Sequence, residues 1–491
     1  MTSKINVRRD GKGRDIPGPS PSRRGTTVAV AVTVLVFALA AQFAVGIEAR
    51  RTLSAEVLAA AAAVFGAVGM LIVSGPLRGR QVSNPTGMLV SLVLGAFGLF
   101  GAPYMVFLHR YSDAPPGSEV LFLTTAAWSA ILVLLTLRRR TSDIIVFAGA
   151  LLILGGIAGI VGNWERPSSF SPFVRYVVEE RWMLLAGVAW ALLWQQLGRA
   201  KERSDVDGVA IPAAVGGILA AVLTAFAHAN DVNIPAALSH GGFWLYSVAA
   251  IASGAAMLLA LRTGGVRVVA GAVALPAVAL TVLTLIEQAT GAFGPQPILL
   301  IPAFGGAVVA LAGATLVWLP DTGETTEGVR SACRFALTIS AAAVLAAFIG
   351  LALPALQGRA TGLRTSGASF DATFVLRGIE VAGPWIAVGI TVAVLGMVLS
   401  RVATRARALA LAAALLAWPL VWATPLRTLT RFIPSEVQVD FGSEFAAIAF
   451  SRLPVPAVFV ALGGAAGALA LLLVCRREPR APDVQASPIE R

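Results

Sequence analysis

Long apolar runs separated by short polar segments fill almost the whole chain. A helix that crosses a bilayer needs roughly 17 to 25 mostly apolar residues, and about fourteen stretches of this sequence satisfy that window. They lie near 26–47, 55–74, 85–108, 119–137, 143–162, 182–197, 208–228, 241–261, 267–287, 297–318, 333–354, 376–400, 406–424 and 455–475. The pattern predicts an all-α, polytopic integral membrane protein, with a helix bundle over 26–475 between a basic disordered tail (1–25) and a C-terminal tail (476–491).

Composition supports a membrane-embedded bundle. Hydrophobic residues make up 57% of the chain and charged residues only 13%, whereas about a quarter of the residues in soluble domains are charged. A soluble fold of this size would lack the polar residues to cover its core. The 49 glycines, together with many alanines, favour helices that approach each other closely.

The basic residues predict the orientation of the bundle. The net charge is +12, but the Lys and Arg residues flank apolar runs in short loops, so they do not indicate nucleic-acid binding. With a cytoplasmic N-terminus, about two thirds of them fall on the cytoplasmic side, and the acidic residues divide almost evenly. Because cytoplasmic loops are enriched in Lys and Arg, we expect both termini in the cytoplasm of a bacterium and the bundle in its plasma membrane.

The first apolar run and the two cysteines limit other interpretations. Gln42, Phe43 and Glu48 follow the core of the first run, where a cleaved signal peptide would have small residues, so we expect this run to be retained. Cys333 and Cys475 both lie near predicted cytoplasmic membrane edges. This position argues against a disulfide framework or a thiolate metal site.

A few ionisable residues near span ends are candidate ligand or pathway residues, because charge inside a membrane is costly. Glu287 lies at the outer end of the ninth run. Arg377 and Glu380 begin the twelfth run, three residues apart on one helix face, where they can pair. The alternative for all three is an ordinary interfacial charge. Prolines inside the runs, as at Pro276, predict kinks or exposed backbone carbonyls.

Two outer segments carry further candidates. His228, Asp231 and His240 surround one short loop, HANDVNIPAALSH. Two imidazoles and one carboxylate can hold a metal ion, but this spacing matches no compact ligand motif, so we predict no metal site.

The outer loop from Asn163 to Trp182 alternates aromatic with charged residues, including Glu165, Arg166 and Arg175. It is typical of an amphipathic helix in the headgroup layer, and the alternative is a lid over an outward cavity. The longest outer loops are 163–181, 355–375 and 425–454.

The sequence contains no motif for catalysis or for a cofactor. Nucleophile, metalloprotease and phosphate-loop signatures do not occur. A transferase acting on lipid-linked sugars would use outer arginines such as Arg427 and Arg431, yet nothing specific singles them out. We therefore predict no catalytic residues and no cofactor.

The stretch from Val57 to Leu137 resembles the N-terminal membrane region of actinobacterial sensor histidine kinases. A basic turn followed by Asn84, Pro85 and Gly87 opens a long Leu/Gly-rich helix, as in that family, although Thr86 and Met88 depart from its pattern. Asn84 suits a helix N-cap and Pro85 suits the first helical turn. No kinase domain follows, so the resemblance implies a sensor whose output resides in a separate partner.

Three functions remain open at this stage. A membrane bundle of this size without a soluble domain favours transport or translocation of a small or amphipathic molecule. The alternative is a signal-sensing or regulatory protein that acts through a partner membrane or signalling protein, and the third is a lipid-linked group transferase. Expected partners are the lipid bilayer and a small-molecule or lipid ligand, without nucleic acid.

Overall fold

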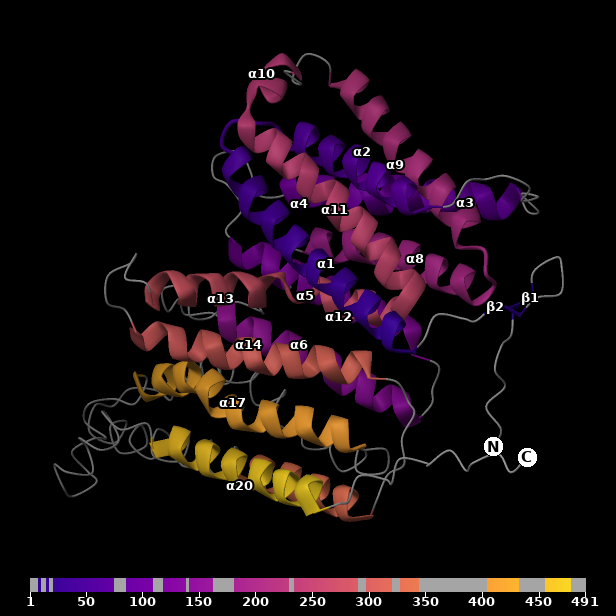
Figure 1. Ribbon diagram of the computed structural model, residues 1–491. Coiled ribbons are helices and arrows are strands. Elements are labelled where there is room, and N and C mark those ends of the chain that lie inside the picture. Colours follow the sequence, from indigo (N-terminus) through magenta and orange to yellow (C-terminus); the bar gives the residue numbers. More distant parts are fainter. Residues whose placement is uncertain are drawn as a thin grey trace, which may run out of the picture. The chain divides into compact units, whose positions relative to one another are not determined.

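The computed structural model describes the helical core of the chain (Figure 1). The described residues are 8–9, 15–16, 21–74, 85–108, 118–137, 141–161, 181–228, 234–289, 297–319, 327–343, 404–431 and 455–477. In this part of the chain the only strands are β1 (Arg8–Arg9) and β2 (Asp15–Ile16), which pair antiparallel within the predicted N-terminal tail. All the other regular elements among the described residues are helices, as the apolar pattern predicted.

The chain divides into two compact units, and each unit combines two separate stretches of sequence. Unit 1 comprises Met1–Pro115 and Ala189–Val273, and unit 2 comprises Pro116–Val188 and Ala274–Arg491. The helices of unit 1 are α1 (Pro21–Ala49), α2 (Ala55–Val73), α3 (Pro85–Gly95), the π-helix η1 (Ala96–Gly101), α4 (Ala102–Leu108), most of α8 (Arg181–Glu202), α9 (Val206–Ala227), α10 (Ile234–Ser239), α11 (Gly241–Gly264) and α12 (Val266–Val273).

Unit 2 begins with the fourth predicted span and includes the start of α8. Its helices are α5 (Ser118–Thr136), α6 (Thr141–Val161), α13 (Pro276–Ala289), α14 (Pro297–Trp318), the helical segment 327–343, α17 (Arg405–Arg431) and α20 (Val455–Arg477).

Six helical stretches of the described residues are long and apolar enough to cross a membrane. They are Gly25–Ala49, Ala55–Val73, Pro85–Leu108, Val206–Ala227, Gly241–Gly264 and Val266–Leu283. Each meets the length that a bilayer requires. The protein is therefore a helical membrane protein.

The predicted runs coincide with helices wherever the structure describes them, and they differ mainly at their polar ends. Helix α3 starts at Pro85, as the Asn-Pro pair predicted. Helix α8 continues to Glu202, and α17 continues to Arg431, so Arg427 is helical and not part of an outer loop. Arg, Lys and Glu have high helix propensity, and this allows a helix to extend beyond its apolar stretch.

The ninth predicted run is interrupted. Helix α12 ends at Val273 and α13 begins at Pro276. Proline has no N–H to donate and its ring clashes with the preceding turn, so a continuous helix is disfavoured there. The proline that predicted a kink thus marks a break between two helices.

Glycines bring pairs of helices into backbone contact. In unit 1, Gly69 of α2 lies against the Ile251 carbonyl of α11. In unit 2, Gly149 and Gly156 of α6 face Gly313 and Gly306 of α14, and a Cβ atom on Gly156 would lie 2.5 Å from the Gly306 carbonyl oxygen. Since the two glycines on each helix are seven residues apart, they share one face of that helix. This is the close small-residue packing that membrane helices favour.

Candidate functional site

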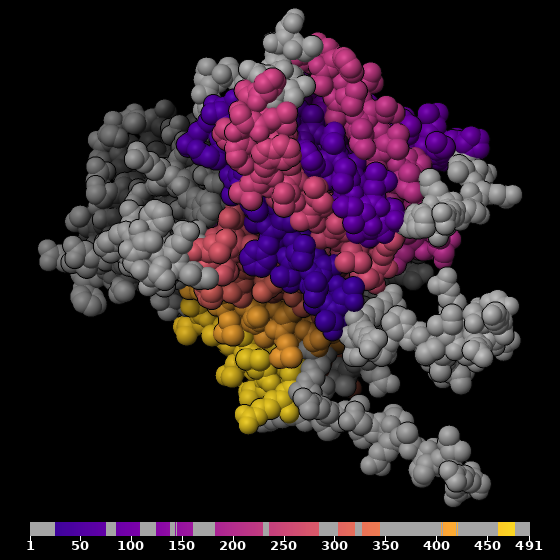
Figure 2. Space-filling view, turned by 45° about the horizontal axis from the view of Figure 1, so that its top comes forward, coloured from indigo at the N-terminus to yellow at the C-terminus, as the bar shows by residue number. Residues whose placement is uncertain are grey.

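The interior of unit 1 contains a chain of uncharged polar side chains, which we call the polar seam: Gln42, Tyr246 and Ser253. Helices α1 and α11 pack side by side, and Figure 2 shows the indigo surface of the first helices next to the pink surface around α11. The Gln42 amide nitrogen donates to the Tyr246 hydroxyl at 3.4 Å. The Ser253 hydroxyl shares its one proton between the Gln42 amide oxygen at 3.1 Å and the Ala250 carbonyl at 3.0 Å. Tyr246 and Ser253 are two helical turns apart on one face, so one Gln42 side chain bridges both.

Aromatic and small residues enclose the seam. The Phe107 ring stands edge-on to the Tyr246 ring with centroids 6.1 Å apart, and Gly46 leaves room for the Tyr246 ring against α1. Tyr246 is only 1% exposed. A buried polar group without a hydrogen bond is expensive in an apolar environment. The seam therefore offers neutral donors and acceptors that satisfy one another.

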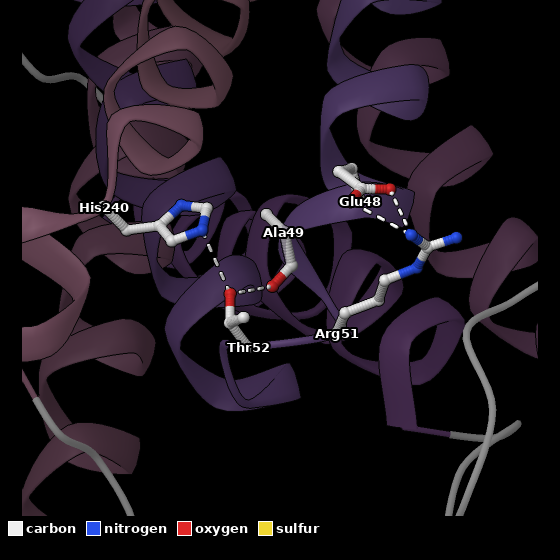
Figure 3. A network of polar contacts seen from close by, with 5 residues as sticks. All are labelled: Glu48, Ala49, Arg51, Thr52 and His240. Atoms are coloured by element: carbon white, nitrogen blue, oxygen red, sulfur yellow. Dashed lines mark hydrogen bonds and ion pairs between the residues drawn. The ribbon is translucent and has the colours of Figure 1, made fainter.

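At one end of α11, a second group of contacts ties the α1–α2 turn to the start of α11 (Figure 3). The Thr52 hydroxyl donates to the Ala49 carbonyl at 3.2 Å, and the His240 Nε2 atom lies 3.2 Å from the Thr52 hydroxyl oxygen. The Thr52 hydroxyl thus connects the Ala49 carbonyl to the His240 ring. Arg51 pairs with Glu48 at 3.0 Å beside this contact.

At the other end of α11, three helix ends meet in what we call the ion-pair clasp. Arg262, in the last turn of α11, donates from Nη2 to the Asp207 carboxylate in the first turn of α9. Its Nη1 donates to the carbonyl of Val73, the last residue of α2, at 2.6 Å. The Arg262 and Asp207 side chains are 27% and 12% exposed. Removing one partner of a buried ion pair typically costs about 3–5 kcal/mol.

Helix dipoles favour the placement of both clasp charges. Asp207 lies at the N-terminal end of α9, where negative charge is stabilised, and Arg262 lies at the C-terminal end of α11, where positive charge is stabilised. The structure thus places one stabilised charge pair at the edge of an apolar bundle.

A third polar contact joins α2 to α4. The Tyr104 hydroxyl donates to the Glu56 carboxylate at 3.5 Å, and the Tyr104 ring stacks on Phe100 with centroids 5.5 Å apart. Phe100 belongs to η1, in which the Ala102 N–H donates to the Phe97 carbonyl five residues earlier. Single π turns often occur near functional sites.

Two of the sequence-predicted site residues have described side chains. His240 contacts Thr52, and His228 ends α9 with its backbone N–H on the Thr224 carbonyl at 2.9 Å. Glu287 lies in α13, and nothing is described of its side chain. The other candidates lie outside the described residues: Asp231, Arg377, Glu380, Glu165, Arg166 and Arg175. Within the described residues, no group of three His, Cys, Asp or Glu side chains is arranged to hold a metal ion.

Sequence reasoning missed the seam and the clasp. Asp207 and Arg262 fall just outside the predicted runs 208–228 and 241–261, although each lies in the terminal turn of a helix. The seven-residue spacing of Tyr246 and Ser253 was the available signal for the seam. Cys333 and Cys475 form no disulfide and are buried in one apolar cluster of unit 2.

Comparison with known proteins gives no family. No protein-family profile matches the chain, and no curated protein matches it. A solved structure described only as "Crystal structure of protein" aligns with a TM-score of 0.41 and 23% sequence identity, over 61% of this chain and 98% of that chain. The functional interpretation therefore rests on the geometry of the seam and the clasp.

Proposed function

We propose that this protein transports or translocates a small or amphipathic molecule across the plasma membrane of a bacterium. In this proposal the bundle has about fourteen spans with both termini in the cytoplasm. The observation that carries the proposal is the polar seam, a group of hydrogen bonds between the apolar helices α1 and α11 of unit 1.

The chemistry of the seam suits a neutral hydrogen-bonding group. Gln42 and Ser253 present an amide and a hydroxyl, which donate and accept in turn. No charged side chain takes part in the contacts of the seam that the structure describes. Polar residues inside a membrane bundle often mark solute pathways, and division into two compact units is common among carriers.

Contacts within unit 1 support the alternating direction of the helices. The end of α2, the start of α9 and the end of α11 meet in the clasp, while the α1–α2 turn and the start of α11 meet at His240. If successive helices alternate in direction, the three helix ends of the clasp lie on one side of the membrane, and the α1–α2 turn and the start of α11 lie on the other. In our scheme the clasp lies on the cytoplasmic side, beside the basic turns.

Transport can be tested in liposomes that contain the purified full chain. The probes are radiolabelled sugars and amino acids and a set of amphipathic fluorescent dyes, each compared with protein-free liposomes. We expect at least one probe to enter faster, and Gln42→Leu and Ser253→Ala to slow it. Ser247→Ala is the matched control, because Ser247 is buried on the same helix but donates only to its own Phe243 carbonyl.

The rival proposal is a sensor that acts through a partner. Its basis is the similarity of 57–137 to the membrane region of sensor kinases. If no probe moves, and a response regulator or a cytoplasmic kinase co-purifies with the chain, sensing replaces transport. If Gln42→Leu, Ser253→Ala and the control Ser247→Ala slow a probe equally, the seam has no specific part in the movement of that probe.

A further inference from the structure

We propose that the start of α9, residues 206–211, is a hinged flap that the Asp207–Arg262 ion pair holds closed at one end of unit 1. Four observations define the flap. The part of α9 beyond it is anchored to α3, the backbone is weakened on each of its two sides, and the ion-pair clasp connects it to α11. The existence of the flap does not depend on the proposed function. Only the idea that an open flap admits the transported molecule rests on that function.

The anchor is the middle of α9. A Cβ atom on Gly95 of α3 would overlap the Ala213 backbone of α9, and one on Gly216 of α9 would overlap the backbone of Leu92. Helices in backbone contact cannot slide or tilt without losing that packing. The part of α9 from Ala213 onward is therefore fixed to α3.

Pro212 separates the anchor from the flap. It lies inside α9, directly before the anchored residues. Because proline donates no hydrogen bond, the Gly208 carbonyl receives none from residue 212, and the helix is weakened at this turn. Residues 206–211 can therefore bend away while the anchored part stays in place.

The other side of the flap is a strained turn. Ser204 has φ of 60°, a left-handed conformation that residues other than glycine seldom adopt. The turn is held by the Asp205 N–H on the Ala200 carbonyl at 2.9 Å. Residues 206–211 thus lie between a strained joint and a proline.

The ion pair is what keeps this segment closed. Asp207 and Ala210 are buried in the closed position, with Ala210 fully covered. Arg262 also holds the Val73 carbonyl, and Gly69 packs on the Ile251 carbonyl. Loss of the Asp207 charge therefore frees the flap but leaves α2 attached to α11.

The test measures exposure directly and needs no substrate. In a full-length chain with Cys333→Ala and Cys475→Ala, one reporter is Ala210→Cys in the flap. The control reporter is Ala250→Cys, which is fully covered in α11. Labelling by N-ethylmaleimide is followed in membrane vesicles. We expect Asp207→Asn to raise the labelling rate at position 210 at least about tenfold, as loss of a buried ion pair implies, and to leave position 250 unchanged.

A second variant tests the hinge. Adding Pro212→Ala to Asp207→Asn restores the missing backbone donor, so labelling at position 210 should fall again. The proposal is wrong if position 210 labels at the wild-type rate in Asp207→Asn, or if positions 210 and 250 accelerate together, which would mean general loosening. Faster labelling at 210 alone, combined with a failed liposome assay, would keep the flap and reject transport.

Discussion

At the scale of single residues, substitutions are least tolerated where the backbone adopts a conformation with positive φ. Gly265 ends α11 with φ of 102° and donates its N–H to the Ala260 and Leu261 carbonyls. Such a conformation is open to glycine and strained for every other residue. Ser204 accepts a similar strain in the turn before α9. These two turns set the directions in which α9 and α12 begin.

Opposite substitutions at these turns should have opposite effects. Ser204→Gly should raise the free energy of unfolding by up to about 1 kcal/mol, since it removes left-handed strain at some entropic cost. Gly265→Ala should lower it by about 1–3 kcal/mol. The midpoint of unfolding in sodium dodecyl sulfate measures both. Equal shifts of the same sign would contradict this account.

At the scale of helices, the apolar pattern predicted the long helices in the part of the chain that the structure describes, because a span of about twenty apolar residues has few alternatives to a helix in lipid. The pattern did not predict which faces pair. Gly66 and Gly69 look equivalent in the sequence, yet a Cβ atom has room at Gly66 and would overlap the Ile251 carbonyl at Gly69. Asp207 and Arg262 are 55 residues apart, so their pairing depends on tertiary packing that periodicity does not encode.

The two glycines of α2 therefore form a matched test of helix packing. Gly69→Ala should destabilise the chain by about 1–3 kcal/mol, because α2 and α11 must separate. Gly66→Ala should be neutral or slightly stabilising, since the new methyl carbon would have its nearest neighbour at 3.9 Å and alanine has the higher helix propensity. Thermal melting of the detergent-solubilised chain distinguishes them. If both variants melt at the same temperature, the α2–α11 contact is looser than described.

At the scale of the whole molecule, the segments of the two units alternate along the sequence. Unit 1 is completed only by the segment that begins at Ala189, and unit 2 only by the segment that begins at Ala274. A chain of this kind must keep its early helices in the membrane while their later partners are synthesised. In the proposed orientation, the Lys and Arg residues of the short turns decide the direction of each helix before packing begins.

The orientation can be checked with reporters. A reporter fused after Arg140 should be cytoplasmic, and one inserted near Ser169 should be outside; both positions lie outside the described residues. Alkaline phosphatase is active only outside and green fluorescent protein fluoresces only inside, so the two reporters check each other. The reverse pattern would overturn the proposed orientation, and with it the cytoplasmic position of the clasp.

The π-helix η1 has a consequence for how relatives of this chain should be aligned. A π turn holds one residue more than an α turn, and each residue of an α-helix turns the chain by about 100°. A relative that lacked one residue between Ala96 and Gly101 would have an α turn in place of the π turn, and α4 would keep its rotation, so that Tyr104 still faced Glu56 and Phe107 still faced Tyr246. Relatives that lack this residue should therefore be aligned with a one-residue gap inside η1, and a gap placed there leaves the contacts of α4 in register.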